Sequence, residues 1–179
     1  MQKQINFTAL LIIFALLINA CSSEKTEPSA TQSSNPNQTE VDKAPEFEVT
    51  TIDGETISLK QTMAENKPMV VYFTASWCPV CAKNWPVLSK LYPEYKDQLN
   101  MVAIGIDPTD DEEVMRKLAK EEGLTFPLTK GQPDIMMAFD VDAQATTVGV
   151  NPDGTIAFRK NKTALSEEEY RTLFDELIN

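Results

Sequence analysis

Histidine is absent from this sequence of 179 residues, and its absence excludes several kinds of site. Without an imidazole the protein cannot contain a Ser-His or Cys-His catalytic pair, or a metal centre with His ligands. Cysteine is scarce as well, and the 3 residues of this type are Cys21, Cys78 and Cys81. A structural zinc ion needs a full tetrahedral set of Cys or His ligands. These cysteines therefore do not indicate a zinc site.

Positive charge is also in short supply. The chain has 16 Lys and Arg residues against 27 Asp and Glu residues, which gives a net charge of −11. An acidic surface repels polyanions, because association with phosphate backbones depends on basic side chains. The composition therefore argues against nucleic acid as a partner.

The N-terminal apolar run is too short to span a membrane. It covers residues 7–18, with the sequence FTALLIIFALLI, and follows a short start in which Lys3 is the only charged residue. A membrane-spanning helix needs about 20 apolar residues. A shorter run after a cationic start is typical of a secretory signal. We therefore expect residues 1–20 to be a signal peptide.

A cysteine follows this run directly, in the sequence Ile18-Asn19-Ala20-Cys21. This tetrapeptide resembles the lipobox of bacterial lipoproteins, although Leu is commoner than Ile at its first position and Asn is unusual at its second. The resemblance implies cleavage before Cys21, lipid attachment to its sulfur, and a lipid-anchored location in the cell envelope outside the cytoplasm. The alternative is an ordinary signal peptide, with no role for Cys21.

The next segment, residues 21–43, does not have the composition of a folded domain. From Ser22 onward it contains no aromatic residue, and Val41 is its one strongly apolar residue. Such a segment cannot bury enough surface to fold. We expect a flexible acidic and polar tether, followed by one folded domain over residues 44–179.

Strand and helix patterns alternate through residues 44–179. Helix spacing covers 79–99, with Pro86 inside, and further helices are expected at 110–122, 133–139 and 166–178. Continuous apolar runs predict buried strands at 69–74 and 101–106. The remaining expected strands are a hairpin at 47–59, a short strand at 125–129 and a second hairpin at 146–159. This order predicts an α/β fold, with a mixed central β-sheet flanked by helices on both faces.

The motif that carries chemistry is Cys78-Pro79-Val80-Cys81, placed between the buried strand at 69–74 and the following helix. Free N–H groups and the helix dipole stabilise a thiolate at a helix N-terminus, and the thiolate is the reactive form. Cys78 is therefore the candidate nucleophile, and Cys81, one turn further on, the resolving cysteine. A pair this close in sequence contributes almost nothing as a structural cross-link.

The sequence Trp77-Cys78-Pro79-Val80-Cys81 after an apolar strand resembles the thioredoxin superfamily, and the rest of the domain resembles its TlpA/ResA branch. The further matching segments are 44–47, 53–54, 67–68, 123–127, 151–154 and 166–170. The resemblance implies a thioredoxin-like fold with an N-terminal β-hairpin extension and a thiol–disulfide oxidoreductase that needs no cofactor or metal. It also implies that exported proteins with disulfides, including apocytochrome c, are substrates. The implied electron donor is a membrane protein of the CcdA/DsbD type.

Two departures from that branch affect the expected site. Ala145 fills the slot of the cis-proline that faces the cysteine pair, so the conformation of its peptide bond stays open. The expected substrate groove contains Trp77, Pro79, Ala145 and Thr146. Tyr72 and Asn84 occupy the two slots where an acidic residue often tunes the pair, which leaves the proton acceptor for Cys81 unidentified. Water is one candidate for that acceptor.

Two other functions compete with disulfide exchange. A metal-binding or redox-inactive scaffold is suggested by the missing proline at Ala145. A peroxidase of the peroxiredoxin type would use T-x-x-C and a distant Arg, whereas Thr74 lies four residues before Cys78.

The two tryptophans have different expected places. Trp77 could contact a partner or cap the end of the strand, and Trp85 is expected in the core.

Overall fold

The structure is a computed structural model that describes residues 42–179. The expected signal peptide 1–20, the expected lipid attachment site Cys21 and nearly all of the expected tether 21–43 lie outside the described residues. The described residues begin at the end of that tether. The carbonyl of Asp42 accepts a hydrogen bond from Ile156 N–H, and Lys43 forms a β-bridge with Thr155.

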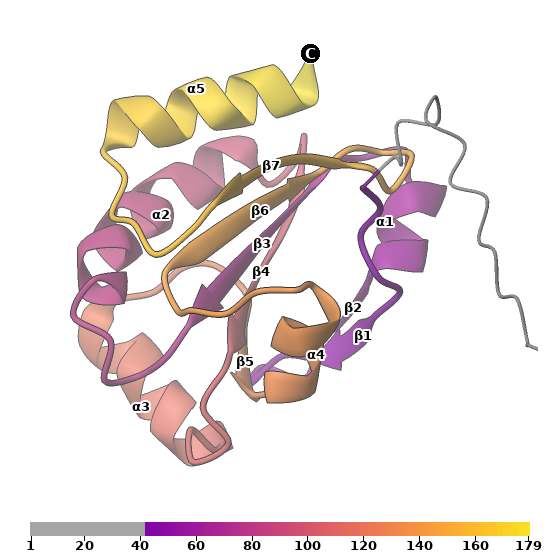
Figure 1. The fold of residues 1–179 in the computed structure, drawn as a ribbon. Coiled ribbons are helices and arrows are strands. Elements are labelled where there is room, and N and C mark those ends of the chain that lie inside the picture. The colour runs from indigo at the N-terminus through magenta and orange to yellow at the C-terminus, as the bar shows by residue number, and fades with distance from the viewer. Residues whose placement is uncertain (1–41) are drawn as a thin grey trace, which may run out of the picture. The chain divides into compact units, whose positions relative to one another are not determined.

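The centre of the fold is a five-stranded mixed sheet in the order β5-β4-β3-β6-β7 (Figure 1). Its middle strand β3 (Met69–Thr74) runs parallel to β4 (Asn100–Gly105) and antiparallel to β6 (Thr146–Val150). The edges are β5 (Leu128–Gly131) and β7 (Ile156–Lys160). The predicted mixed α/β sheet is therefore confirmed.

Helices cover both faces of this sheet (Figure 1). One face packs against α2 (Cys81–Tyr95), α3 (Glu112–Glu122) and α5 (Glu167–Ile178). The other face packs against α4 (Pro133–Ala138) and the N-terminal elements. Because β3 is covered on both sides, all of its residues are buried, which explains its unbroken apolar sequence.

The N-terminal extension contains the predicted hairpin and a helix that was not predicted. Strands β1 (Glu48–Thr50) and β2 (Thr56–Ser58) form a separate two-stranded antiparallel sheet. Helix α1 (Leu59–Ala64) follows at once, and Ser58 Oγ accepts a hydrogen bond from Gln61 N–H at 3.1 Å. Ser58 and Gln61 have the spacing of a capping box, a signal that could have located this helix start.

Helix α2 accommodates Pro93 through a contact from another element. Proline has no N–H, so Pro93 leaves the carbonyl of Ser89 without its partner in the helix. Thr125, from the loop after α3, donates its hydroxyl to that carbonyl at 2.7 Å. Trp85 on the same helix is 2 % exposed, as expected for a core residue, and its indole N–H donates to Thr74 Oγ1.

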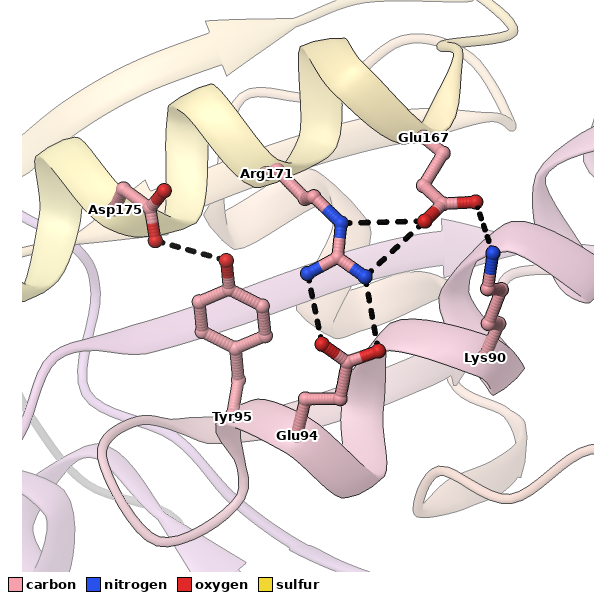
Figure 2. A network of polar contacts seen from close by, with 6 residues as sticks. All are labelled: Lys90, Glu94, Tyr95, Glu167, Arg171 and Asp175. Carbon is pink, nitrogen blue, oxygen red and sulfur yellow. Dashed lines mark hydrogen bonds and ion pairs between the residues drawn. The ribbon is translucent and has the colours of Figure 1, made fainter.

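A network of charged side chains joins α2 to α5 (Figure 2). Arg171 donates to both carboxylate oxygens of Glu94, at 2.8 and 2.9 Å, and also to Glu167. Lys90 donates to the other oxygen of Glu167 at 2.6 Å. These hydrogen bonds from Arg171 lower the pKa of Glu94. The network ties the last helix of the chain to the helix that carries Cys81.

No helix within residues 42–179 combines the length and apolarity that crossing a bilayer requires.

Candidate redox site

Cys78 and Cys81 form a disulfide where β3 leads into α2. Their Cα atoms are 5.2 Å apart, and both residues are buried. Helix α2 begins at Cys81, two residues later than the sequence suggested, because Pro79 and Val80 form a turn. The first helical hydrogen bond nevertheless runs from Ala82 N–H to the carbonyl of Cys78, at 3.1 Å. The pair therefore lies at the N-terminal end of the helix.

The helix start supplies a hydrogen-bond donor to one of the two sulfurs. Cys81 N–H points at Cys78 Sγ, with N and S 3.0 Å apart. Val80, the N-cap residue, makes no side-chain cap, so no side chain competes for this end of the helix. In the reduced protein, this N–H and the helix dipole would stabilise a thiolate on Cys78. The geometry is suited to nucleophilic chemistry at that sulfur.

The loop before Cys78 is held by two aspartates that the sequence analysis did not identify as site residues. Ser76 donates its backbone N–H and its hydroxyl to the carboxylate of Asp110, at 2.8 and 2.6 Å. Trp77, which is 57 % exposed, donates its indole N–H to Asp107 at 2.7 Å. Both aspartates lie just after β4, the parallel neighbour of β3. The carboxyl ends of neighbouring parallel strands meet at one edge of a sheet, so the acidic segment 107–111 was a usable signal.

Tyr72 and Asn84, at the two positions where an acidic residue often tunes the cysteine pair, are neutral and form a hydrogen bond with each other. Asn84 Nδ2 donates to Tyr72 Oη at 3.2 Å and to the carbonyl of Thr163 at 2.9 Å. Asn84 Oδ1 accepts from Leu165 N–H at 2.9 Å. Burial raises the pKa of Tyr72 far above its ordinary value. Tyr72 and Asn84 therefore form an uncharged network beside the start of α2.

Ala145 has a backbone conformation that proline cannot adopt. Its φ is +57°, and its N–H donates to the carbonyl of Phe73 at 2.8 Å. Proline has no N–H and a φ fixed near −65°. The replacement of the expected cis-proline by Ala145 thus goes together with a backbone conformation that proline could not have. Of the expected groove residues, Trp77 and Pro79 are exposed, whereas Ala145 and Thr146 are fully buried.

The competing functions gain no support from the described residues. All 3 arginines pair with carboxylates: Arg116 with Glu112, Arg159 with Asp42, and Arg171 with Glu94 and Glu167. Thr74 is buried and accepts a hydrogen bond from Trp85. Within residues 42–179, no group of His, Cys, Asp and Glu side chains is arranged to hold a metal ion.

A mixed sheet with a disulfide-bonded C-x-x-C pair between its central strand and a helix defines a redox protein of thioredoxin-like fold. Residues 41–159 match the AhpC/TSA family, and the chain belongs to this family. The predicted fold and superfamily are therefore confirmed.

The chain is similar in sequence to a thioredoxin-like protein and to thiol-disulfide oxidoreductases. The thioredoxin-like protein YneN of Bacillus subtilis is 32% identical over 115 residues, covering 64% of this chain and 66% of YneN, just under two thirds of its length. The thiol-disulfide oxidoreductase ResA of Halalkalibacterium halodurans is 30% identical over 139 residues, or 76% of each chain. A thiol:disulfide interchange protein from Chlorobium tepidum has the same fold, with a TM-score of 0.70 at 18% identity, covering 79% of this chain and 99% of that one.

Proposed function

We propose that this protein is a thiol–disulfide oxidoreductase that works outside the cytoplasm and reduces disulfides in exported proteins. The observation that carries this proposal is the Cys78–Cys81 disulfide at the start of α2, with Cys81 N–H directed at Cys78 Sγ. A disulfide that closes so small a loop adds little stability. Its value is therefore chemical, as a pair that can be opened and closed by exchange.

The reaction proceeds in two exchanges. The thiolate of Cys78 attacks a substrate disulfide, forms a mixed disulfide and releases one substrate thiolate. Cys81, once deprotonated, attacks Cys78 Sγ, which closes the Cys78–Cys81 bond and releases the second substrate thiol. Two electrons thus pass from the protein to the substrate. Tyr72 and Asn84 are uncharged, so we assign the proton of Cys81 to water.

The location and partners of the protein are part of the same proposal. Residues 1–20 are the signal peptide, Cys21 carries the lipid anchor, and the following tether lets the domain reach partners near the membrane. A CcdA/DsbD-type membrane protein restores the dithiol. Substrates include the haem-binding cysteines of apocytochrome c or disulfides formed by oxidative damage. The lipobox-like Ile18-Asn19-Ala20-Cys21 supports the location, and the thiol-disulfide oxidoreductase activity in the name of the ResA relatives supports disulfides as the substrates.

The test is to trap the substrate. Cys81→Ser removes the resolving thiol, so the variant should accumulate mixed disulfides on Cys78 that a reductant releases and mass spectrometry identifies. Cys78→Ser is the matched control, because it also leaves one thiol of the pair but removes the one that the helix start activates. Equal trapping by both variants, or none by either, would contradict the proposed function.

A further inference from the structure

We propose that Asp110 is a positioning residue for the redox pair, and that its buried charge keeps the pair strongly reducing. This inference rests on the proposed thiol–disulfide exchange. Asp110 is 3 % exposed. One carboxylate oxygen accepts from Ser76 N–H at 2.8 Å, and the other accepts from Ser76 Oγ at 2.6 Å. Both oxygens act as acceptors, which is the pattern of an ionised carboxylate.

No Lys or Arg side chain within residues 42–179 forms an ion pair with this carboxylate. The other charged groups near this end of the sheet differ from Asp110 in exposure. Asp107 accepts a hydrogen bond from the Trp77 indole, and Asp111 is the exposed N-cap of α3. The cations Lys83, in the first turn of α2, and Lys130, next to Gly131, are both exposed. Asp110 is therefore the buried charge of this set.

The backbone around Asp110 prevents the carboxylate from moving away. Its N–H donates to the carbonyl of Asp107 at 3.0 Å, and its carbonyl accepts from Gly131 N–H at 2.7 Å. A Cβ atom at Gly131 would lie 1.7 Å from the carbonyl oxygen of Asp107, so only glycine lets the end of β5 approach this closely. The loop is fixed between the end of β5 and Ser76.

This fixed charge acts on the cysteine that follows. Ser76 lies in the turn that leads into Cys78, which Cys78 N–H closes on the carbonyl of Ala75 at 3.1 Å, so Asp110 is hydrogen-bonded to the same short loop that carries the nucleophile. A buried negative charge opposes a nearby thiolate and raises the pKa of its thiol. It therefore offsets part of the stabilisation from the helix start and from Cys81 N–H. Because the thiolate belongs to the reduced form, Asp110 makes the reduction potential more negative.

The test is the redox equilibrium of the full chain, with Cys21→Ser so that only the pair reacts. In this exchange two glutathione thiols are oxidised to glutathione disulfide while the Cys78–Cys81 bond takes up two electrons. At a pH where Cys78 is ionised, one of the two protons released by glutathione goes to Cys81 and the other goes to the solvent. We expect Asp110→Asn to shift this equilibrium constant toward the dithiol about tenfold, which corresponds to about 30 mV. The matched control Asp111→Asn removes the same charge from an exposed neighbour and still caps α3, so its constant should stay within about twofold of the parent protein.

A second variant separates charge from hydrogen bonding. Ser76→Ala keeps the carboxylate and its backbone donor but removes the hydroxyl that disperses its charge. Its equilibrium constant should move toward the disulfide, and this sign decides the matter if Asp110→Asn does not fold. A Ser76→Ala constant that is unchanged or shifted toward the dithiol, or equal constants for Asp110→Asn and Asp111→Asn, would overturn the role of Asp110. A parent protein that does not exchange with glutathione at all would instead overturn the proposed function.

Discussion

At the scale of single residues, Ala145 is where the backbone itself enforces a departure from the pattern that the sequence resembles. Ala145→Pro should lower the free energy of unfolding by about 3 kcal/mol or more, because it removes the hydrogen bond to Phe73 and cannot adopt a positive φ. Urea titration of the oxidised protein measures this change. Ala145→Gly is the control and should be close to neutral, because glycine adopts this φ without strain. A proline variant as stable as the parent would show that the loop has another conformation.

Tyr72 gives the protein a dependence on alkaline pH. Burial raises its pKa in the folded state, so the unfolded chain loses this proton first as pH rises above about 10. The stability is therefore full below pH 10 and decreases above it. Tyr170, also buried with a raised pKa, acts in the same direction. We expect Tyr72→Phe to make the free energy of unfolding fall less steeply with pH, by a slope that corresponds to about one proton. Denaturant unfolding between about pH 9 and 11 measures this slope. An unchanged slope would exclude Tyr72 as a source of the decrease.

At the scale of elements, the junction between α2 and α5 depends on charge. Arg171→Met should lower stability at low ionic strength, because Glu94 and Glu167 lose their shared partner (Figure 2). These exposed interactions are screened by salt, so the difference should shrink in concentrated NaCl. Thermal unfolding at low and high salt tests this. Lys117→Met, which removes a single exposed pair with Glu121, is the control and should show a smaller dependence on salt.

The same junction should weaken in acid. Glu94 and Glu167 have lowered pKa values in the folded state, so their contribution is present above the ordinary pKa of a glutamate and is lost as pH falls through the lowered values. We expect the stability difference between the parent and Arg171→Met to vanish as both carboxylates become protonated. A difference that persists in acid would mean that Arg171 acts through packing of its aliphatic chain.

The sequence was sufficient for elements whose patterns are local. Strand β3 was predicted at its observed bounds because both of its faces are buried, and α5 because its capping box is formed by Ser166 and Glu169. Helix α1 was missed because it follows β2 without a turn. At the site, Cys78 and Cys81 were proposed from their C-x-x-C spacing together with their place between an apolar strand and a helix and with Trp77 directly before them. The role of Asp110 could not, because its contact with Ser76 joins positions 34 residues apart, and the sequence suggested only a helix start there.

At the scale of the whole molecule, the expected lipid on Cys21 would confine the redox domain to the membrane surface. The full chain expressed in a bacterium should therefore fractionate with membranes. Because Cys21→Ser also removes the expected lipobox cleavage site, this variant is made with residues 1–20 replaced by a conventional cleavable signal peptide, and it should be released in soluble form. Cell fractionation with immunoblotting measures this. A Cys21→Ser protein that stays with membranes would show that some other segment anchors the chain.

The proposed thiol–disulfide exchange depends on Cys78 becoming a reactive thiolate when the disulfide opens. The most direct measurement is the rate at which iodoacetamide alkylates each cysteine of the reduced protein as a function of pH, followed by mass spectrometry of the modified peptides. The account predicts that Cys78 reacts before Cys81, with a midpoint below the ordinary thiol value of about 8.5. Equal, slow alkylation of both cysteines, with a midpoint at or above that value, would contradict it.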